Sequence, residues 1–392
     1  MADSSPSDAK SLVALLKQSG YLDAPLEAAF RAIPRGSFLA HLPPEEAYRD
    51  EAIPIKVDED GTVLSSSSQP SMMAIMLRQL QLQPGHNVLE IGAGTGYNAA
   101  LIQHIVGDEG KVTSLEIDLT VAETARANLQ RVAMSEVLIV EADGAQGYAP
   151  RASYDRIIAT AGIWDVPQAW VRQLKPGGIL VTPLWVEGFE VSAALVLQPD
   201  GTLYSQSNRF CSFIPLRGQD AVPEIAVRVG TSGLYLYSNS KIDSAALQML
   251  ISDDSAENYF GISLEAWEYW QGFLPYLVLH IPESFILAYY QVARDASAYG
   301  MSGRGFMLMT PGSACFVSSA ERGTARSFGS ADALLAAQEA LAAWERDGKP
   351  QGDRLRLRLV PKSAAPETAS APQDAKAYPR RDHMLIVSME LA

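Results

Sequence analysis

The residues of this chain that are best suited to hold a ligand lie in one short segment, VLEIGAGTGY, at residues 88–97. An apolar run in this segment leads into Gly92, Gly94 and Gly96, and a helical pattern follows. Glycine lets the backbone turn tightly and approach a ligand without a Cβ in the way, and the first turn of a helix presents free N–H groups. A glycine-rich turn by itself indicates either a nucleotide-like ligand or only a tight turn, so its context must decide.

Two acidic residues follow at the ends of the next two predicted strands. Glu116 ends the strand KVTSLEID, twenty residues after Gly96, where a doubly wound fold places the carboxylate that accepts both hydroxyl groups of a ribose. Asp143 lies in the sequence EADG at residues 141–144, and a carboxylate at that level can bind the exocyclic amine of an adenine. Each acid alone is also compatible with a solvated strand end or a turn.

The spacing of the glycines discriminates between two kinds of nucleotide ligand. A dinucleotide-binding fingerprint requires G-x-G-x-x-G, whereas this chain has G-x-G-x-G with Tyr97 at the place of the last glycine. The pattern therefore favours a mononucleoside ligand over NAD, and an NAD-dependent oxidoreductase is a weaker alternative.

The elements that must position these residues alternate regularly from residue 86 onward. Short apolar runs such as HNVLEIG, EVLIVEAD and YDRIIATA are separated by helical stretches, which predicts an α/β fold with a doubly wound, mostly parallel sheet over residues 86–200. Helices are expected in residues 9–50, before the sheet. A helix near residues 167–174, the turn KPGG and two further strands complete this part.

Beyond residue 215 the alternation weakens, and residues 216–392 are predicted to form a mixed α+β accessory domain. Ser330 is a candidate N-cap of a helix that ends at Gly348, and LRLRLV at 355–360 has the alternation of a strand. Residues 361–380 are rich in Pro, Ala and Ser and are expected to be a flexible loop before a last strand.

The composition of the 392 residues excludes several classes of function. The net charge is −14, which repels phosphate backbones, so no nucleic-acid partner is expected. Two cysteines and five scattered histidines give no metal cluster and no disulfide framework. No signal peptide and no uninterrupted apolar run of membrane-spanning length is present, so we expect a cytoplasmic protein without a membrane partner.

The order of the motifs resembles a class I methyltransferase over roughly residues 10–215, and more narrowly the protein-L-isoaspartate O-methyltransferase family. The narrower resemblance is carried by Ser68-Gln69-Pro70, MMAIMLRQL, LQPGHNVLEIGAGTGY, YDRIIATA and LKPGG, with AFRAIPRGSFL and AYRDEAIPI upstream. It implies a methyltransferase domain at residues 1–215, followed by the accessory domain.

The resemblance also implies a cofactor and roles for individual residues. The methyl donor would be S-adenosyl-L-methionine, with S-adenosyl-L-homocysteine as product and no metal. The residues expected to bind it are Glu90, Gly92, Gly94, Thr95, Gly96, Glu116, Ile117, Asp143 and Gly144. Ser68 would hydrogen-bond the acceptor carboxylate, with Ser67, Gln69 and Ser71 near the substrate. Helix capping is the alternative role of Ser68.

The function implied is methylation of the carboxylate of L-isoaspartyl or aspartyl residues in proteins or peptides, giving a methyl ester that can cyclise to a succinimide. Ser65, Ser66 and Ser67 stand where the family usually has a Gly-Gln-Thr-Ile-like stretch, and Ser71 stands where a bulky ring is common. Together with the long C-terminal region, these departures leave two alternatives: a dedicated aspartyl methyltransferase that tailors a ribosomally made peptide, and a non-catalytic cofactor-binding module. The sequence predicts no oligomeric state.

Overall fold

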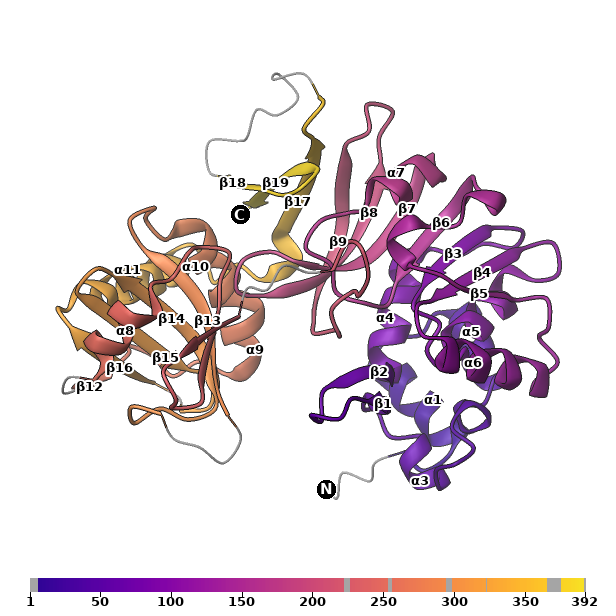
Figure 1. Cartoon of the computed structure of the whole chain (residues 1–392), viewed down its shortest axis with the longest axis horizontal. Helices are drawn as coiled ribbons and strands as arrows, with labels where there is room; N and C mark the ends of the chain where they lie inside the picture. Colours follow the sequence, from indigo (N-terminus) through magenta and orange to yellow (C-terminus); the bar gives the residue numbers. More distant parts are fainter. Residues whose placement is uncertain are drawn as a thin grey trace.

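The computed structural model describes residues 6–221, 226–252, 256–293, 298–321, 323–364 and 375–390. These residues form two lobes, each built around one large sheet (Figure 1). The sheet of the first lobe has ten strands in the order β18-β19-β17-β9-β8-β7-β6-β3-β4-β5, and the sheet of the second lobe has seven.

The parallel half of the ten-stranded sheet carries the predicted motifs. Its strands are β3 (Asn87–Ile91), β4 (Lys111–Glu116), β5 (Leu138–Glu141), β6 (Tyr154–Ala159) and β7 (Leu174–Trp185). The pairs β3–β4, β4–β5, β3–β6 and β6–β7 are parallel, so the carboxyl ends of these strands meet at one edge. The strands β8 (Glu190–Leu197) and β9 (Leu203–Cys211) continue the sheet in antiparallel order.

Helices cover both faces of this sheet, as the doubly wound fold predicted. One face packs against α1 (Ala9–Gln18), α2 (Ala24–Ala32), α4 (Pro70–Leu80), α5 (Tyr97–Val106) and α6 (Leu119–Arg131) through one buried apolar cluster. The other face packs against α7 (Gln168–Gln173), whose Trp170 is fully buried. Aspartate side chains cap α1, α2 and α6 by accepting backbone N–H bonds in the first turn, which fixes where these helices begin.

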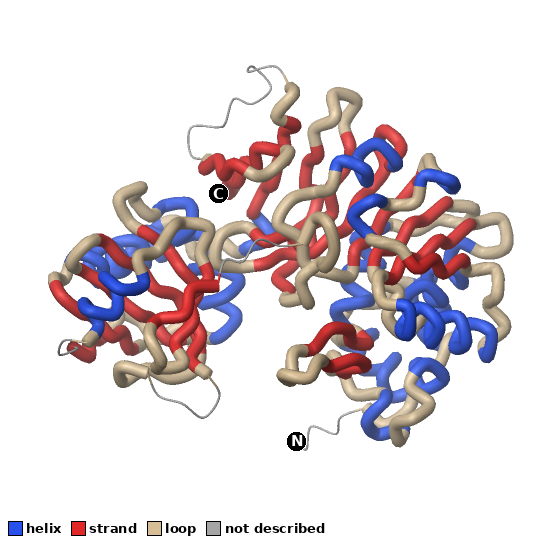
Figure 2. The backbone as a smooth tube through the Cα atoms, viewed as in Figure 1, coloured by secondary structure: helices blue, strands red, loops and turns tan. Residues whose placement is uncertain are grey.

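A short hairpin and two small helices lie beside the carboxyl edge of the sheet. The hairpin consists of β1 (Ile53–Val57) and β2 (Val63–Ser67), which pair in antiparallel order, and the chain enters α4 directly after β2. The 3₁₀ helix η1 (Arg35–Phe38) and the short helix α3 (Pro44–Ala47) precede the hairpin. In the tube representation, this hairpin lies below the ten-stranded sheet on the side of the second lobe (Figure 2).

The second lobe is an antiparallel sheet with helices packed on it. Its strand order is β10-β11-β13-β14-β15-β16-β12. The strands are β10 (Ala226–Val229), β11 (Leu234–Tyr237), β12 (Ala256–Tyr259), β13 (Ile286–Val292), β14 (Arg304–Thr310), β15 (Ser313–Ser318) and β16 (Thr324–Gly329). The helices are α8 (Ser244–Ile251), α9 (Ala266–Glu268), the π-helical turn η4 (Tyr269–Phe273), α10 (Leu274–His280) and α11 (Asp332–Arg346).

The end of the chain corrects the predicted division at residue 215. Strands β17 (Leu355–Pro361), β18 (Lys376–Pro379) and β19 (His383–Met389) do not belong to the second lobe but return to the first sheet, where β17 pairs with β9 (Figure 1). The apolar residues Leu355, Leu357 and Leu359 bury one face of β17 in the core that the two lobes share. Pairing β17 with β9 also satisfies backbone groups that an open sheet edge would leave unpaired.

Three smaller predictions are corrected or fall outside the structure. KPGG does not form a separate turn but lies within the first residues of β7. The register between β7 and β6 shifts in this region. The N-cap of α11 is Ala331 and not Ser330, whose hydroxyl instead donates to Asp332. Of the predicted loop at 361–380, residues 365–374 lie outside the described residues, and residues 376–379 form β18.

The predicted fold class is confirmed, and both lobes share one continuous apolar core that contains Trp170 of α7 and Trp344 of α11. Among the described residues, no helix has the length and apolar character needed to cross a membrane.

Candidate active site

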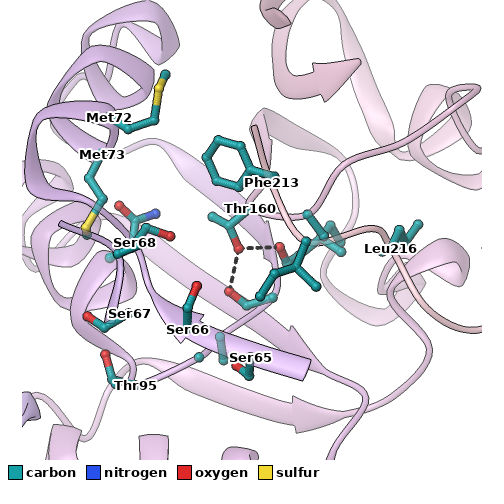
Figure 3. Close-up of a pocket in the computed structure, with 18 of the residues that line it drawn as sticks. Ser65, Ser66, Ser67, Ser68, Met72, Met73, Thr95, Thr160, Phe213 and Leu216 are labelled. Carbon is teal, nitrogen blue, oxygen red and sulfur yellow. Dashed lines mark hydrogen bonds between the residues drawn. The ribbon is translucent and has the colours of Figure 1, made fainter. Parts of the chain in front are cut away.

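A cavity of about 480 Å³ lies at the carboxyl edge of the parallel strands. Its walls are formed by the hairpin and α4 on one side, by the ends of β3, β4 and β6, and by the segment that follows β9. Figure 3 shows Ser68 and Met73 on one side, Leu216 on the other, and Thr160 and Phe213 between them. The cavity is lined by nine of the predicted residues: Ser67, Ser68, Gln69, Gly92, Gly94, Thr95, Glu116, Ile117 and Gly144.

The glycine turn between β3 and α5 has the backbone that its sequence predicted. Gly92, Gly94 and Gly96 all have positive φ angles, of 95°, 53° and 84°, which side chains with a Cβ adopt only with strain. A Cβ on Gly92 would lie 2.5 Å from the Thr160 hydroxyl oxygen. That hydroxyl lies 2.9 Å from the Gly92 carbonyl oxygen and donates to it. Gly96 is the N-cap of α5 and lies behind the cavity lining.

Glu116 lies at the floor of the cavity with its carboxylate held by the backbone. Its Oε2 accepts the Gly94 N–H at 3.1 Å, and its Oε1 accepts the Asp118 N–H at 3.2 Å. The Arg217 guanidinium lies 4.0 Å from Oε1. Burial raises the pKa of Glu116, and the hydrogen bonds from Gly94 and Asp118 and the charge of Arg217 oppose that rise. The glycine turn and the acid at the end of β4 are thus bonded to each other.

Glu90 does not line the cavity, although it was expected to bind the cofactor. Its carboxylate is fully buried beneath the glycine turn, where it accepts from the Asn98 amide at 2.8 Å and from the Ser114 hydroxyl. Burial raises the pKa of Glu90 to about 7. Asn98 does line the cavity, and among the described residues its Oδ1 has no hydrogen-bond partner although it is buried. Glu90 therefore orients Asn98, which presents a free acceptor.

Asp143 and Ser71 also lie outside the cavity lining. The Asp143 carboxylate accepts the N–H groups of Ala145 at 3.0 Å and of Gln219 at 2.7 Å. Ser71 is in the first turn of α4, where its backbone N–H donates to Asp50 Oδ1 at 2.8 Å. Both residues therefore shape elements of the cavity wall from behind in this structure.

Ser68 lies at the junction of β2 and α4, and its capping alternative is wrong. The N-cap of α4 is Gln69, which makes no capping bond, and Asp50 binds the Ser71 N–H instead. Within the described residues, no hydrogen bond of the Ser68 hydroxyl is present. Its carbonyl accepts from the Arg35 guanidinium at 3.0 Å, which anchors the backbone.

Several lining residues were missed by the sequence analysis. The segment Phe210–Arg217 forms a whole wall of the cavity, and Met72, Met73 and Met76 of α4 form an apolar part of another. The first wall corresponds to the stretch NRFCSFIPLRG, in which no periodic pattern marks a ligand-binding wall. Thr160 lies in YDRIIATA and Asn98 directly follows the glycine turn, but no local pattern gave either residue a role. The fold brings Thr160 against Gly92 and places Asn98 on Glu90. In the described part of the chain no group of metal-ligating side chains is present.

A cavity at the carboxyl edge of a doubly wound sheet, with a glycine turn after the first parallel strand and an acid on the second, is the arrangement expected of a class I methyltransferase. The model of the family described as protein-L-isoaspartate(D-aspartate) O-methyltransferase matches residues 7–221, which is more than half of the chain. The chain therefore belongs to that family, as the sequence predicted.

Individual relatives agree with this assignment. The chain is 36% identical over 215 residues to a protein-L-isoaspartate O-methyltransferase of Methanopyrus kandleri, covering 54% of this chain and 92% of that protein. It is 38% identical over 216 residues to one of Pyrococcus horikoshii, covering 54% and 93%. A solved structure named protein-L-isoaspartate O-methyltransferase matches 89% of this chain and 96% of its own, with 24% identity and a TM-score of 0.51. That match reaches into the C-terminal region and shows its fold.

The enzyme class predicted from the sequence, a carboxyl methyltransferase, is confirmed by the family, whose methyl donor is S-adenosyl-L-methionine. The cavity fits this donor on three observations. The backbone at Gly94 borders open space that a Cβ would fill, Glu116 presents a carboxylate for hydroxyl groups, and Asn98 presents a buried unpaired acceptor. The acceptor is suited to the ammonium group of the donor's methionine part.

Proposed function

We propose that this chain transfers the methyl group of S-adenosyl-L-methionine to the carboxylate of L-isoaspartyl residues in proteins or peptides. The single observation that carries the proposal is that Ser68, with no hydrogen bond from its hydroxyl to another described residue, lines the same cavity as the glycine turn and Glu116. A donor held at the turn and an acceptor held at Ser68 would share this one cavity.

The residues proposed for the cofactor divide into two groups. Gly92, Gly94, Thr95, Glu116, Ile117 and Gly144 line the cavity and are proposed to contact it directly. Glu90, Gly96 and Asp143 do not line the cavity and are proposed to position residues that do. Glu90 orients Asn98 and Gly96 begins α5. Asp143 accepts the N–H groups of Ala145 and Gln219. Gly144 lies tightly against Ile91, because a Cβ there would come within 2.4 Å of its Cγ2.

When bound, S-adenosyl-L-methionine would supply an electrophilic methyl group attached to a sulfonium sulfur. A carboxylate has a reference pKa near 4 and is ionised at neutral pH, so the acceptor needs no general base. With the donor held beside Gly92, Gly94 and Glu116, the acceptor oxygen would bond to the methyl carbon as the carbon–sulfur bond breaks, and the electron pair left on sulfur would give S-adenosyl-L-homocysteine. The neighbouring backbone nitrogen can then attack the carbonyl carbon of the methyl ester. This closes a succinimide ring and releases methanol.

What this chain must provide is therefore orientation and exclusion of water. The Ser68 hydroxyl is proposed to donate to one oxygen of the acceptor carboxylate, while the apolar side chains of Met72, Met73 and Phe213 keep water from it. Gln69 is exposed beside Ser68 and lines the cavity, so it is a better candidate for a contact with the substrate than Ser67 or Ser71. Ser67 faces the Arg35 guanidinium at 3.4 Å and Ser71 faces Asp50, so both are proposed to support the loop.

The partner is proposed to be a protein or peptide and not a nucleic acid, since the net charge of the chain is −14. We also propose that the enzyme works in a reducing compartment such as the cytoplasm, because Cys211 and Cys315 are unpaired and burial raises the pKa of both thiols. Residues 1–215 are proposed as the catalytic unit, with strands β17–β19 completing its sheet.

The test compares Ser68→Ala with the wild type and with Ser37→Ala, a control on η1 outside the cavity lining. Paired peptides that differ only in carrying isoaspartate or aspartate are incubated with methyl-labelled cofactor, and binding of S-adenosyl-L-homocysteine is measured by calorimetry. A hydrogen bond to a charged group contributes ~1.5–3 kcal/mol, so Ser68→Ala should lower kcat/KM for the isoaspartyl peptide roughly tenfold to a hundredfold. Binding of S-adenosyl-L-homocysteine should not change.

Each failure has a separate meaning. Wild-type activity in Ser68→Ala would remove the proposed role of the hydroxyl. A wild type that prefers the aspartyl peptide would favour peptide tailoring over repair. If the chain binds S-adenosyl-L-homocysteine but methylates neither the two peptides nor an unfolded substrate protein, the result would support the non-catalytic module.

A further inference from the structure

The wall of the cavity that follows β9 has little regular structure of its own. Ser212–Ala221 makes one isolated bridge, between Pro215 and Gly162, with backbone bonds of 2.9 Å and 2.8 Å. Phe213 is held by its N–H, which donates to Glu190 Oε2 at 2.7 Å. Side-chain contacts must therefore fix the rest of this wall.

The far end of the wall is bound to Asp143. The Gln219 N–H donates to Asp143 Oδ2 at 2.7 Å. Gly218, with a φ of 99°, lies so close that a Cβ on it would come within 2.5 Å of the same oxygen. Since Asp143 is proposed to act on the adenine side of the cofactor, the position of residues 218–220 is coupled to that side of the site.

The next residue, Asp220, is held from the other end of the chain. Arg381, in the turn between β18 and β19, forms a bidentate pair with the Asp220 carboxylate, in which Nη2 lies 2.7 Å from Oδ2 and Nη1 donates to Oδ1. The Asp220 side chain is only 14% exposed, whereas that of Arg381 is 43% exposed. A bidentate arginine–carboxylate pair fixes both distance and direction.

The two residues after Arg381 hold a second segment of the same site. The Asp382 N–H donates to Asp165 Oδ2 at 2.6 Å, and His383 Nδ1 lies 2.8 Å from Asp165 Oδ1. Asp165 and His383 are both buried. Asp165 belongs to the loop after β6, and the same loop carries Gly162, which bridges Pro215.

We infer that the turn Arg381-Asp382-His383 is a positioning device of the C-terminal strands for the cofactor cavity. Arg381 fixes the outer wall through Asp220, and Asp382 and His383 fix the loop after β6 through Asp165. The inference rests on the proposed function, because it assigns to the C-terminal strands a role in holding the wall of the cofactor site. Arg381 is a positioning residue and touches neither cofactor nor substrate.

The test uses the full chain and three variants: Arg381→Ala, Asp220→Asn and the charge-exchanged double variant Arg381→Asp with Asp220→Arg. Arg356→Ala is the matched control, because Arg356 makes a similar bidentate pair with Glu390, at 3.0 Å and 2.6 Å, away from the cavity. Dissociation of S-adenosyl-L-homocysteine is measured by calorimetry, KM and kcat are measured with an isoaspartyl peptide, and Tm reports folding.

Arg381→Ala and Asp220→Asn should each raise the Kd of S-adenosyl-L-homocysteine and the KM of the methyl donor roughly threefold to tenfold, with kcat little changed. The exchanged pair should recover part of the affinity, and Arg356→Ala should change neither constant. Equal Kd values for the wild type and both single variants would overturn the inference while leaving the proposed function intact. A wild type that binds no S-adenosyl-L-homocysteine would overturn both.

Discussion

Replacement of Arg35 by methionine tests how the loop that carries Ser68 is held. Arg35 is fully buried, and its guanidinium donates to the carbonyls of Arg49 at 2.7 Å, Glu51 at 3.1 Å, Ser67 at 3.2 Å and Ser68 at 3.0 Å. Burial lowers the pKa of Arg35 to about 10, which still leaves the side chain charged at neutral pH. Arg35→Met keeps an unbranched apolar stem, although a shorter one, and removes these four bonds together with the bond to the Ser67 hydroxyl at 3.4 Å.

The size of the effect follows from these contacts. Hydrogen bonds to a charged group contribute ~1.5–3 kcal/mol each, so the loss of the bonds to Ser67 and Ser68 alone should lower the free energy of unfolding by about 3–6 kcal/mol. The Ser68 backbone loses its anchor, and a displacement of about 1 Å at a positioning group can cost roughly a hundredfold in rate. We expect kcat/KM to fall by about that factor.

The measurement combines urea unfolding, peptide methylation and binding of S-adenosyl-L-homocysteine at a temperature where the variant is folded. Gly92 and Glu116 do not contact Arg35, so the Kd of S-adenosyl-L-homocysteine should stay within about threefold of the wild type. Arg78→Met is the control, because Arg78 also donates to a carbonyl, that of Gly20 at 2.7 Å, but lies exposed on α4. Full methylation activity in Arg35→Met would refute the reasoning, as would an equal loss in Arg78→Met.

Two further predictions concern the glycine turn and the buried acid beneath it. Gly92→Ala should lower the free energy of unfolding by about 2–4 kcal/mol, because a φ of 95° is strained for alanine and the new Cβ would displace the Thr160 hydroxyl. The control is Gly107→Ala, which has open space around its Cβ. In urea unfolding, Gly107→Ala should lower the free energy of unfolding by less than Gly92→Ala does. Glu90 has a folded pKa of about 7, above its unfolded value of 4.5, so the folded state binds more protons between these values and stability falls as pH rises through them. Between pH 5.5 and 7.5 this loss should be about 2 kcal/mol, and Glu90→Gln should remove it; parallel stability curves for the two proteins would contradict the assignment.

The C-terminal strands show where sequence patterns stopped being informative. The alternation of LRLRLV predicted a strand, and β17 forms there. Its partner is β9, about 150 residues earlier in the chain, and no local pattern encodes such a pairing. The prediction therefore assigned the strand to the nearest region in sequence, whereas the open edge beside β9 determined its place.

The sequence by itself determined the family, the parallel strands, the glycine turn and the acid at Glu116, because each of these depends on residues that are close together in the chain. The Ser-Gln-Pro element also predicted Ser68 as the acceptor-side hydroxyl, and Ser68 lines the cavity. Only the tertiary structure decided that Glu90 and Asp143 lie outside the cavity lining and that Asp50 accepts the Ser71 N–H. It likewise decided that Arg35 bonds to the Ser68 carbonyl and Arg381 to Asp220. These roles depend on distances between segments far apart in the chain, which are set by how the sheet edges and helices pack.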